Sequence, residues 1–169
     1  QERPRPIVVS AGDIVNAATK WVQNQTCRQL MLATWKQTCD YWPDADDDGY
    51  YSIKLDLKPL SSITHVKYYN TSGTLTTVSS GDYWAITTSV RPTVTFNPNE
   101  FDWPTLQDSR PDPIEITFVA GYASATEVPK DLNRAIQLLA RYWYEINMAA
   151  SPVVASQSPT DGQPVTYGE

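Results

Sequence analysis

The chain has 169 residues, of which 41% are hydrophobic and 19% are charged, which is typical of one folded domain with appended segments. The formal net charge of −6 argues against a protein that grips nucleic acid through its phosphates, because such binding requires clustered Lys and Arg. The sequence shows no signal peptide and no apolar run long enough to cross a bilayer, so no membrane partner is expected.

The N-terminal segment, residues 1–12, is expected to be an extended arm because it contains two prolines and charges of both signs. At its end, Ser10 and Asp13 have the spacing of a capping box, in which each side chain bonds the backbone N–H of the other. Apolar residues follow at helical spacing. They predict a helix from Asp13 to about Gln25, with Trp21 in the core.

The middle of the chain has the pattern of β-strands. Ile53, Leu55 and Leu57 alternate with charged residues, which predicts a half-buried strand. The segment 61–70 keeps strand composition but drifts in phase, so a β-bulge is expected there, and Asn70–Gly73 has the composition of a hairpin turn. Further strand-like segments lie at 33–41, 74–79, 82–87, 93–97 and 114–122. About seven strands are predicted, and their short connections favour antiparallel pairing.

A second helix is predicted to begin near Pro129, because proline suits the first turn of a helix. One stripe at helical spacing is expected to form the core: Leu132, Ala135, Ile136, Leu139, Trp143 and Ile146. Leu138, Tyr142 and Tyr144 lie off this stripe. Burying them requires another surface, which is either the sheet or a second subunit.

The predicted class is therefore α+β, with helices at both ends of an antiparallel β-rich insertion of about seven strands. Residues 13–150 form the folded domain. Residues 151–169 have the composition of a disordered segment and are expected to be an extended C-terminal arm. The long polar segment 97–113 lies between two strands, and loops of this length are commonly functional or disordered.

No constellation of catalytic residues is recognisable. His65 is the single histidine, and with two separated cysteines, Cys27 and Cys39, it gives no zinc-binding spacing. Asp44–Gly49 matches the first half of a calcium loop, but Leu55 occupies the position of the bidentate glutamate, so a solvated acidic turn is the preferred interpretation. The phosphate-binding glycine motifs are missing. We expect no enzyme, no catalytic residue, no metal site and no cofactor.

Four stretches, taken in order, resemble the head–tail connector (adaptor) proteins of tailed bacteriophages, in the branch with a β-rich insertion that also occurs in gene transfer agents. The resemblance covers about Asp13 to Asn147. The first helix ends in a T-x-R-x-L element, and the first strand ends in an aromatic-Pro step. The matching residues there are Thr26, Arg28, Leu30, Trp42 and Pro43. The hairpin motif matches through Pro59, Leu60, Ser62, Ile63, Val66, Tyr68 and Gly73. The closing segment matches through Trp103, Pro104, Ala120, Gly121, Tyr122, Val128, Pro129, Ile136, Leu139, Trp143, Tyr144 and Glu145.

The resemblance implies a structural virion protein at the head–tail interface, assembled in the host bacterial cytoplasm. Members of the family form a ring, typically of twelve subunits, beneath the portal protein. The ring extends the DNA channel, through which DNA passes without specific binding, and it presents a surface to the stopper or tail-completion protein. The family has neither enzymatic activity nor a cofactor.

This role assigns candidate residues to three groups. The subunit or portal interface is expected at Leu138, Tyr142, Tyr144, Pro152, Val153, Val154, Pro159, Pro164 and Tyr167. The loop expected to project toward the next tail component carries Phe101, Asp102 and Trp103. The core is expected at Trp21, Leu132, Ile136, Leu139 and Trp143.

Other functions stay open at this point. Within virion proteins, the nearest alternative is a stopper or tail-completion protein. A β-rich domain laden with Trp and Tyr also suits a carbohydrate-binding module of a fibre or baseplate, and exposed Trp at strand edges would support that function. An esterase or glycosidase is the least favoured class.

Overall fold

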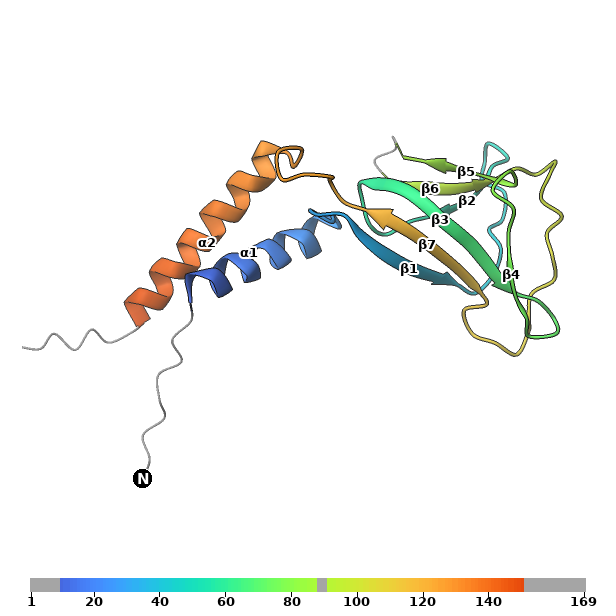
Figure 1. The fold of residues 1–169 in the computed structure, drawn as a ribbon, viewed down its shortest axis with the longest axis horizontal. Helices are drawn as coiled ribbons and strands as arrows, with labels where there is room; N and C mark the ends of the chain where they lie inside the picture. The colour runs from blue at the N-terminus through green and yellow to red at the C-terminus, as the bar shows by residue number, and fades with distance from the viewer. Residues whose placement is uncertain (1–9, 88–90, 151–169) are drawn as a thin grey trace, which may run out of the picture.

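The computed structural model describes residues 10–87 and 91–150 (Figure 1). In chain order the elements are α1 (Ala11–Thr26), β1 (Ala33–Cys39), β2 (Tyr51–Lys54), β3 (Leu60–Tyr69), β4 (Leu75–Thr77), β5 (Tyr83–Ile86), β6 (Thr93–Phe96), β7 (Ile114–Ala120) and α2 (Lys130–Ala150). The expected class is confirmed: two helices flank seven antiparallel strands in the described residues. Of the proposed N-terminal arm, 1–12, residues 1–9 lie outside the described residues, whereas Ser10 is the cap of α1 and Ala11 and Gly12 belong to its first turn. The proposed C-terminal arm, 151–169, also lies outside the described residues.

The helix α1 begins where the capping box predicts. The Ser10 hydroxyl accepts a hydrogen bond from the Asp13 backbone N–H at 3.1 Å, and the Asp13 carboxylate accepts one from the Ser10 N–H at 3.3 Å. Two N–H groups that the first turn leaves unpaired are thereby satisfied. The helix starts at Ala11, two residues before the expected position, because the cap is Ser10 itself.

The strands form two sheets that pack face to face. The four-stranded sheet has the order β1-β7-β3-β4, and the three-stranded sheet has the order β2-β6-β5. The register of β3 against β7 shifts twice, between Leu60 and Ser62 and between Ile63 and His65, so the expected bulge is confirmed. The hairpin turn is also confirmed: the Asn70 side chain accepts from the N–H groups of Ser72 and Thr74, both at 3.0 Å.

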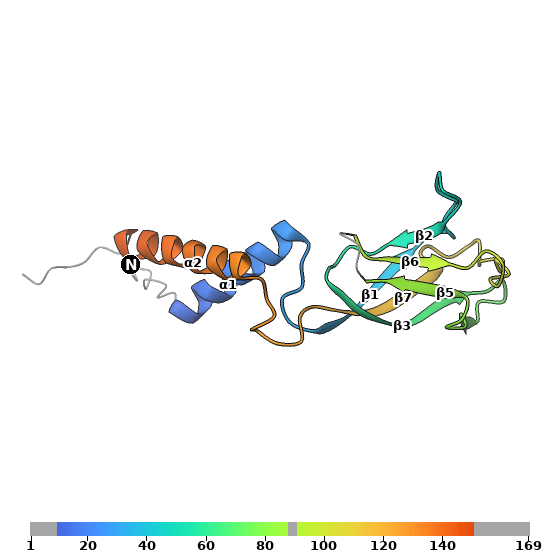
Figure 2. The ribbon, with the colours of Figure 1, turned by 90° about the horizontal axis from the view of Figure 1, so that it is seen from above.

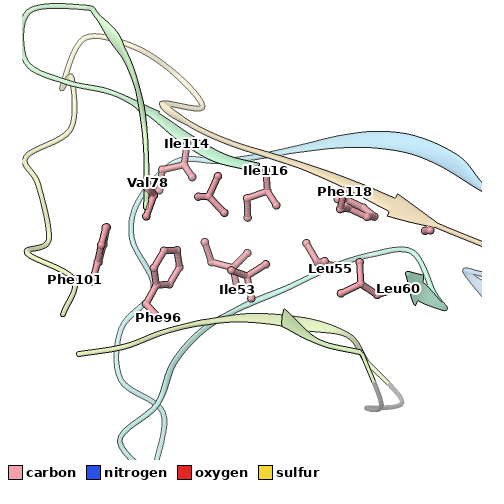
Figure 3. Packing of buried hydrophobic residues seen from close by; sticks show 12 residues of the cluster. Ile53, Leu55, Leu60, Val78, Phe96, Phe101, Ile114, Ile116 and Phe118 are labelled. Carbon is pink, nitrogen blue, oxygen red and sulfur yellow. The ribbon is translucent and has the colours of Figure 1, made fainter. Parts of the chain in front are cut away.

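The core of the sandwich lies between the two sheets. Ile114, Ile116 and Phe118 of β7 point toward the three-stranded sheet, where Ile53 and Phe96 face them (Figure 3). Alternate residues of β7 are buried, because side chains alternate across a strand. The predicted inward set of Ile53, Leu55 and Leu57 is observed as two buried residues and one partly buried residue, although β2 ends at Lys54.

The helices form an antiparallel pair at one end of the sandwich (Figures 1 and 2). Two connectors, residues 27–32 and 121–129, join this helix pair to the sandwich. The connectors are bonded to each other: the Leu32 N–H donates to the Tyr122 carbonyl at 3.2 Å, and Arg28 Nη1 lies 2.8 Å from the Tyr122 hydroxyl. Gly121 stands at this crossing with a φ of +121°, and a Cβ there would lie 2.3 Å from the Met31 carbonyl oxygen. Only glycine allows the two backbones to approach so closely.

Candidate interaction surfaces

The helix pair buries a small apolar cluster. Ile14 and Ala18 of α1 meet Ala140 of α2, and the larger side chains of α2 pack around them, namely Ile136, Leu139 and Trp143. The two alanines let the helices approach closely. The cluster is small for two helices of 16 and 21 residues, so much of their apolar surface stays outside it.

Three of the five expected core residues, Ile136, Leu139 and Trp143, pack against this cluster while staying partly buried. Leu132 is also only partly buried. The prediction that Trp21 lies in the core is wrong, since 49% of it is exposed. The buried ridge of α1 runs through Ile14, Ala18 and Val22, and Trp21 lies beside that ridge because its position is rotated by roughly 60° from it.

A second apolar stripe runs along α2 without a partner in the described residues. Leu138, Tyr142 and Ile146 are 51%, 59% and 48% exposed, and their spacing of four residues aligns them along one side of the helix. We call these three residues the α2 outer stripe. Ile146, which helical spacing predicts for the core stripe, belongs here instead. The residues of α2 that pack in the cluster with α1 end at Trp143. Tyr144, 46% exposed, lies on the other flank of the helix.

Three of the nine residues predicted for the interface, Leu138, Tyr142 and Tyr144, are thus solvent-exposed apolar positions on α2. Their role at an interface stays a prediction. The other six predicted interface residues lie outside the described residues: Pro152, Val153, Val154, Pro159, Pro164 and Tyr167.

The long segment 97–113 folds back onto the sandwich. Phe101 is 6% exposed and belongs to the core cluster, where Trp103 packs against it with ring centroids 4.9 Å apart. Trp42 Nε1 donates to the Pro104 carbonyl at 2.8 Å and fixes the segment to the end of β1. The prediction that Phe101 and Trp103 project toward a partner is therefore wrong. Asp102 alone of the three is exposed.

The end of the sandwich far from the helices is strongly acidic. The loops 40–50, 70–82 and 97–113 meet at this end (Figure 1). They carry ten carboxylates against one arginine, a formal charge of −9. Because the whole chain carries −6, the remainder has a formal charge of +3. We call these three loops the acidic tip.

The end of the sandwich next to the helices is basic. Two open pockets of about 380 and 230 Å³ lie side by side there and share Cys27 and Asp56 in their linings. Their walls carry five cations from α1, the connector, the end of β2 and the sandwich loops: Lys20, Arg28, Lys54, Lys58 and Arg91. Among the described residues that line the two pockets, Asp56 is the only carboxylate. We call this site the junction groove.

The residues with possible chemistry are scattered. Cys27 is exposed and Cys39 is partly buried, both as free thiols. Burial, followed by the carboxylates of Asp112, Asp56 and Asp40, raises the pKa of the Cys39 thiol, which makes it a weak nucleophile near neutral pH. No three His, Cys, Asp or Glu residues in the described part of the chain are arranged to hold a metal ion. Within the same residues, no helix is long and apolar enough to span a membrane.

Comparison with known proteins yields matches by structure. No family model matches the sequence, and no curated protein matches it. A chain of the neck of a native gene transfer agent (GTA) particle, computed with C12 symmetry, aligns with 80% of this chain and 69% of its own, at a TM-score of 0.63 and 21% identity. A chain of the virion of a native GTA particle aligns with 92% of this chain and 70% of its own, at a TM-score of 0.66 and 21% identity.

A third match is a chain of the neck of an empty GTA particle, computed with C6 symmetry. It aligns with 80% of this chain and 65% of its own, at a TM-score of 0.64 and 22% identity. At such identities the likeness establishes a shared fold: an antiparallel helix pair joined to a β-sandwich.

Proposed function

We propose that this chain is a structural protein of the neck of a phage-like particle, in which several copies form a ring between head and tail. The observation that carries the proposal is the fold likeness to chains from GTA necks and virions, which extends over at least 80% of this chain. Two of those necks were computed with C12 and C6 symmetry, and such cyclic symmetry is that of a closed ring.

Within the neck, we assign the chain the role of adaptor. In this role a ring, of twelve copies, lies under the portal protein, extends the DNA channel and offers an attachment surface to the stopper or tail-completion protein. The order of motifs from Thr26 to Glu145 supports the assignment. The acidic charge of the chain supports it too, because a negative wall repels phosphate and does not trap a strand that must slide past.

The helix pair carries exposed apolar surfaces on both helices, as such a ring requires. Closed rings form through two different faces of each subunit, because neighbouring copies meet head to tail. On α2, the outer stripe presents exposed Leu138 and Tyr142, and on α1, Val15 and Trp21 are 48% and 49% exposed. We propose that the α2 outer stripe of one copy packs against α1 of the next.

The experiment is to replace Leu138 and Tyr142 together by serine in the full chain. Both side chains are more than half exposed, so the melting temperature should stay within a few degrees of wild type. Ring formation should be lost, as measured by light scattering coupled to size exclusion and by negative-stain electron microscopy. Gln137→Ser is the matched control, because Gln137 is exposed on α2 and lies on a different side of the helix.

Two results would contradict the proposal. Rings that persist in the double variant would remove the α2 outer stripe from the interface. A wild-type chain that stays monomeric, and that antibodies do not detect at the neck of the particle, would remove the neck assignment altogether.

One observation favours a second candidate, a carbohydrate-binding module. Trp35 on the edge strand β1 and Trp84 on the edge strand β5 are 38% and 49% exposed, and exposed aromatic rings at sheet edges suit stacking on sugars. A glycan array separates the two functions. Specific glycan binding that Trp84→Ala abolishes, by a protein that forms no ring, would favour the module.

A further inference from the structure

The junction groove holds cations that the described residues do not neutralise. Lys20, Lys54 and Lys58 form no ion pair within the described part of the chain, where the lysine that does so is Lys36, with Glu115. Asp56 is the single carboxylate that the described part of the chain contributes to the lining. Unpaired charges of one sign around a groove attract a ligand of the opposite sign. The groove therefore suits an anionic ligand.

An anionic element of matching character stands at the acidic tip. The turn 44–50 precedes β2 and projects from the sandwich (Figure 2). Its shape is held by Asp46, whose carboxylate accepts from the N–H groups of Asp48 and Tyr50 at 3.1 and 2.7 Å. Asp44, Asp47 and Asp48 are exposed, and their carboxylates form no ion pair within the described part of the chain. The turn is thus ordered before it binds, which lowers the entropic cost of binding.

The groove and the turn lie at opposite ends of the same sandwich (Figure 1), so they cannot meet within one molecule. We propose that the turn 44–50 of one copy docks in the junction groove of a neighbouring copy. The contact joins two different patches, as a head-to-tail ring requires, and to that extent it rests on the proposed function. It adds an electrostatic contact between sandwiches to the apolar contact between helices.

The complementarity extends beyond charge. Tyr50, in the turn, is 56% exposed, and Trp35, in the wall of the groove, is 38% exposed. An aromatic pair beside the ion pairs would add apolar burial at the same contact.

Thiol cross-linking tests the contact directly, because Cys27 lines the groove and is exposed. The full chain carries Asp47→Cys and Cys39→Ala, and a short bis-maleimide is added to the assembled protein. Denaturing gels should show a ladder of dimers, trimers and larger species. A head-to-tail contact propagates, whereas a contact between two tips stops at dimers. Two chains with a single cysteine are the controls: one adds Cys27→Ser, and the other keeps Asp47. Neither should form cross-linked dimers, because each lacks one partner of the contact.

Charge exchange tests the physical cause. Lys54→Glu with Lys58→Glu, in the Asp47→Cys chain, should lower the yield of trimers and larger species at least tenfold. Asp44→Lys with Asp48→Lys should do the same. The chain that carries all four substitutions should regain part of the ladder, because positions 44 and 48 of the turn then face positions 54 and 58 of the groove with opposite charges, while the other three cations of the groove are unchanged.

The outcomes separate this inference from the proposed function. Rings without a ladder, or efficient dimer formation by either chain with a single cysteine, overturn the docked turn and leave the neck assignment intact. A wild-type chain that neither forms rings nor cross-links counts against both. If reversal of Lys54 and Lys58 leaves the ladder unchanged but abolishes retention of the protein on immobilised DNA, the groove serves nucleic acid and the inference is wrong.

Discussion

Replacing Gly121 by alanine should destabilise the chain more than any other glycine substitution for which the structure gives a contact. The new Cβ would lie 2.3 Å from the Met31 carbonyl oxygen and 2.7 Å from the Leu32 nitrogen, both of them backbone atoms. A side chain at a φ of +121° costs about 1–3 kcal/mol in strain. Separating the connectors breaks the bonds from Gly121 N–H to the Pro59 carbonyl and from Leu32 N–H to the Tyr122 carbonyl, at about 1 kcal/mol each.

The expected total is about 3–5 kcal/mol in the free energy of unfolding, obtained by adding these strain and hydrogen-bond costs. For a chain of this size that loss lowers the melting temperature by roughly 6–20 °C. Thermal and urea unfolding followed by circular dichroism measure it. Hydrogen exchange at the Leu32 amide should accelerate in the variant, because its bond to the other connector is broken.

Two other glycines separate the strain from the clash. Gly49 has a φ of +82°, and nothing lies within 4 Å of the position that an alanine methyl group would take, so Gly49→Ala should cost only about 1–2 kcal/mol. Gly81→Ala has ordinary space around it, with Ser79 Oγ at 3.8 Å, and should change stability by less than about 0.5 kcal/mol. If Gly121→Ala lowers the free energy of unfolding no more than Gly49→Ala does, the two connectors separate at little cost. The crossing would then not hold the helix pair rigidly to the sandwich.

Three further predictions follow from the same structure, and a fourth follows from the sequence of residues 151–169. Phe96→Ala should cost about 3–5 kcal/mol by chemical denaturation, because its side chain is fully buried between the sheets; a loss below about 1 kcal/mol would contradict that packing. Ser10→Ala should cost about 1 kcal/mol through loss of the cap, and Ser10→Asp should restore most of it. Maleimide at pH 7 should modify Cys27 well before Cys39, and Cys39 labelling should rise only at alkaline pH, since its pKa is raised; equal rates at pH 7 would refute the burial. Deleting residues 151–169 should leave the melting temperature unchanged while the protein no longer joins heads stably, as counted in particles by electron microscopy; intact attachment would exclude a role for the arm.

The elements that the sequence predicts well are those governed by local rules. The capping residues Ser10 and Asp13 and the turn at Asn70 depend on backbone groups within four residues, so their geometry follows from spacing alone. Alternation at Ile53 and Leu55 works for a similar reason, because a strand has only two faces and the sandwich buries one of them. The bulge in β3 is detectable as a break in that alternation.

The wrong predictions concern side chains whose surroundings are set by distant residues. Helical spacing groups Trp21 with Ile14 and Val22, but a helix with one partner buries a narrow ridge and leaves its flanks exposed. Phe101 lies in a long polar segment with no periodicity, so nothing local signals its burial. Its aromatic neighbour Trp42 lies 59 positions earlier in the sequence, and only the fold brings the two rings together.

The separation of charge along the sandwich arises in the same way. In an antiparallel sandwich, successive loops alternate between the two ends, so charges far apart in sequence gather at one end when they occupy alternate loops. The runs at Asp44–Asp48 and at Glu100–Asp112 are ordinary solvated turns when read singly. Once the strand directions are known, both fall at the tip, whereas Lys54, Lys58 and Arg91 fall at the junction. The chain is therefore not uniformly acidic, and its net charge of −6 conceals a basic end at which an anionic partner can bind.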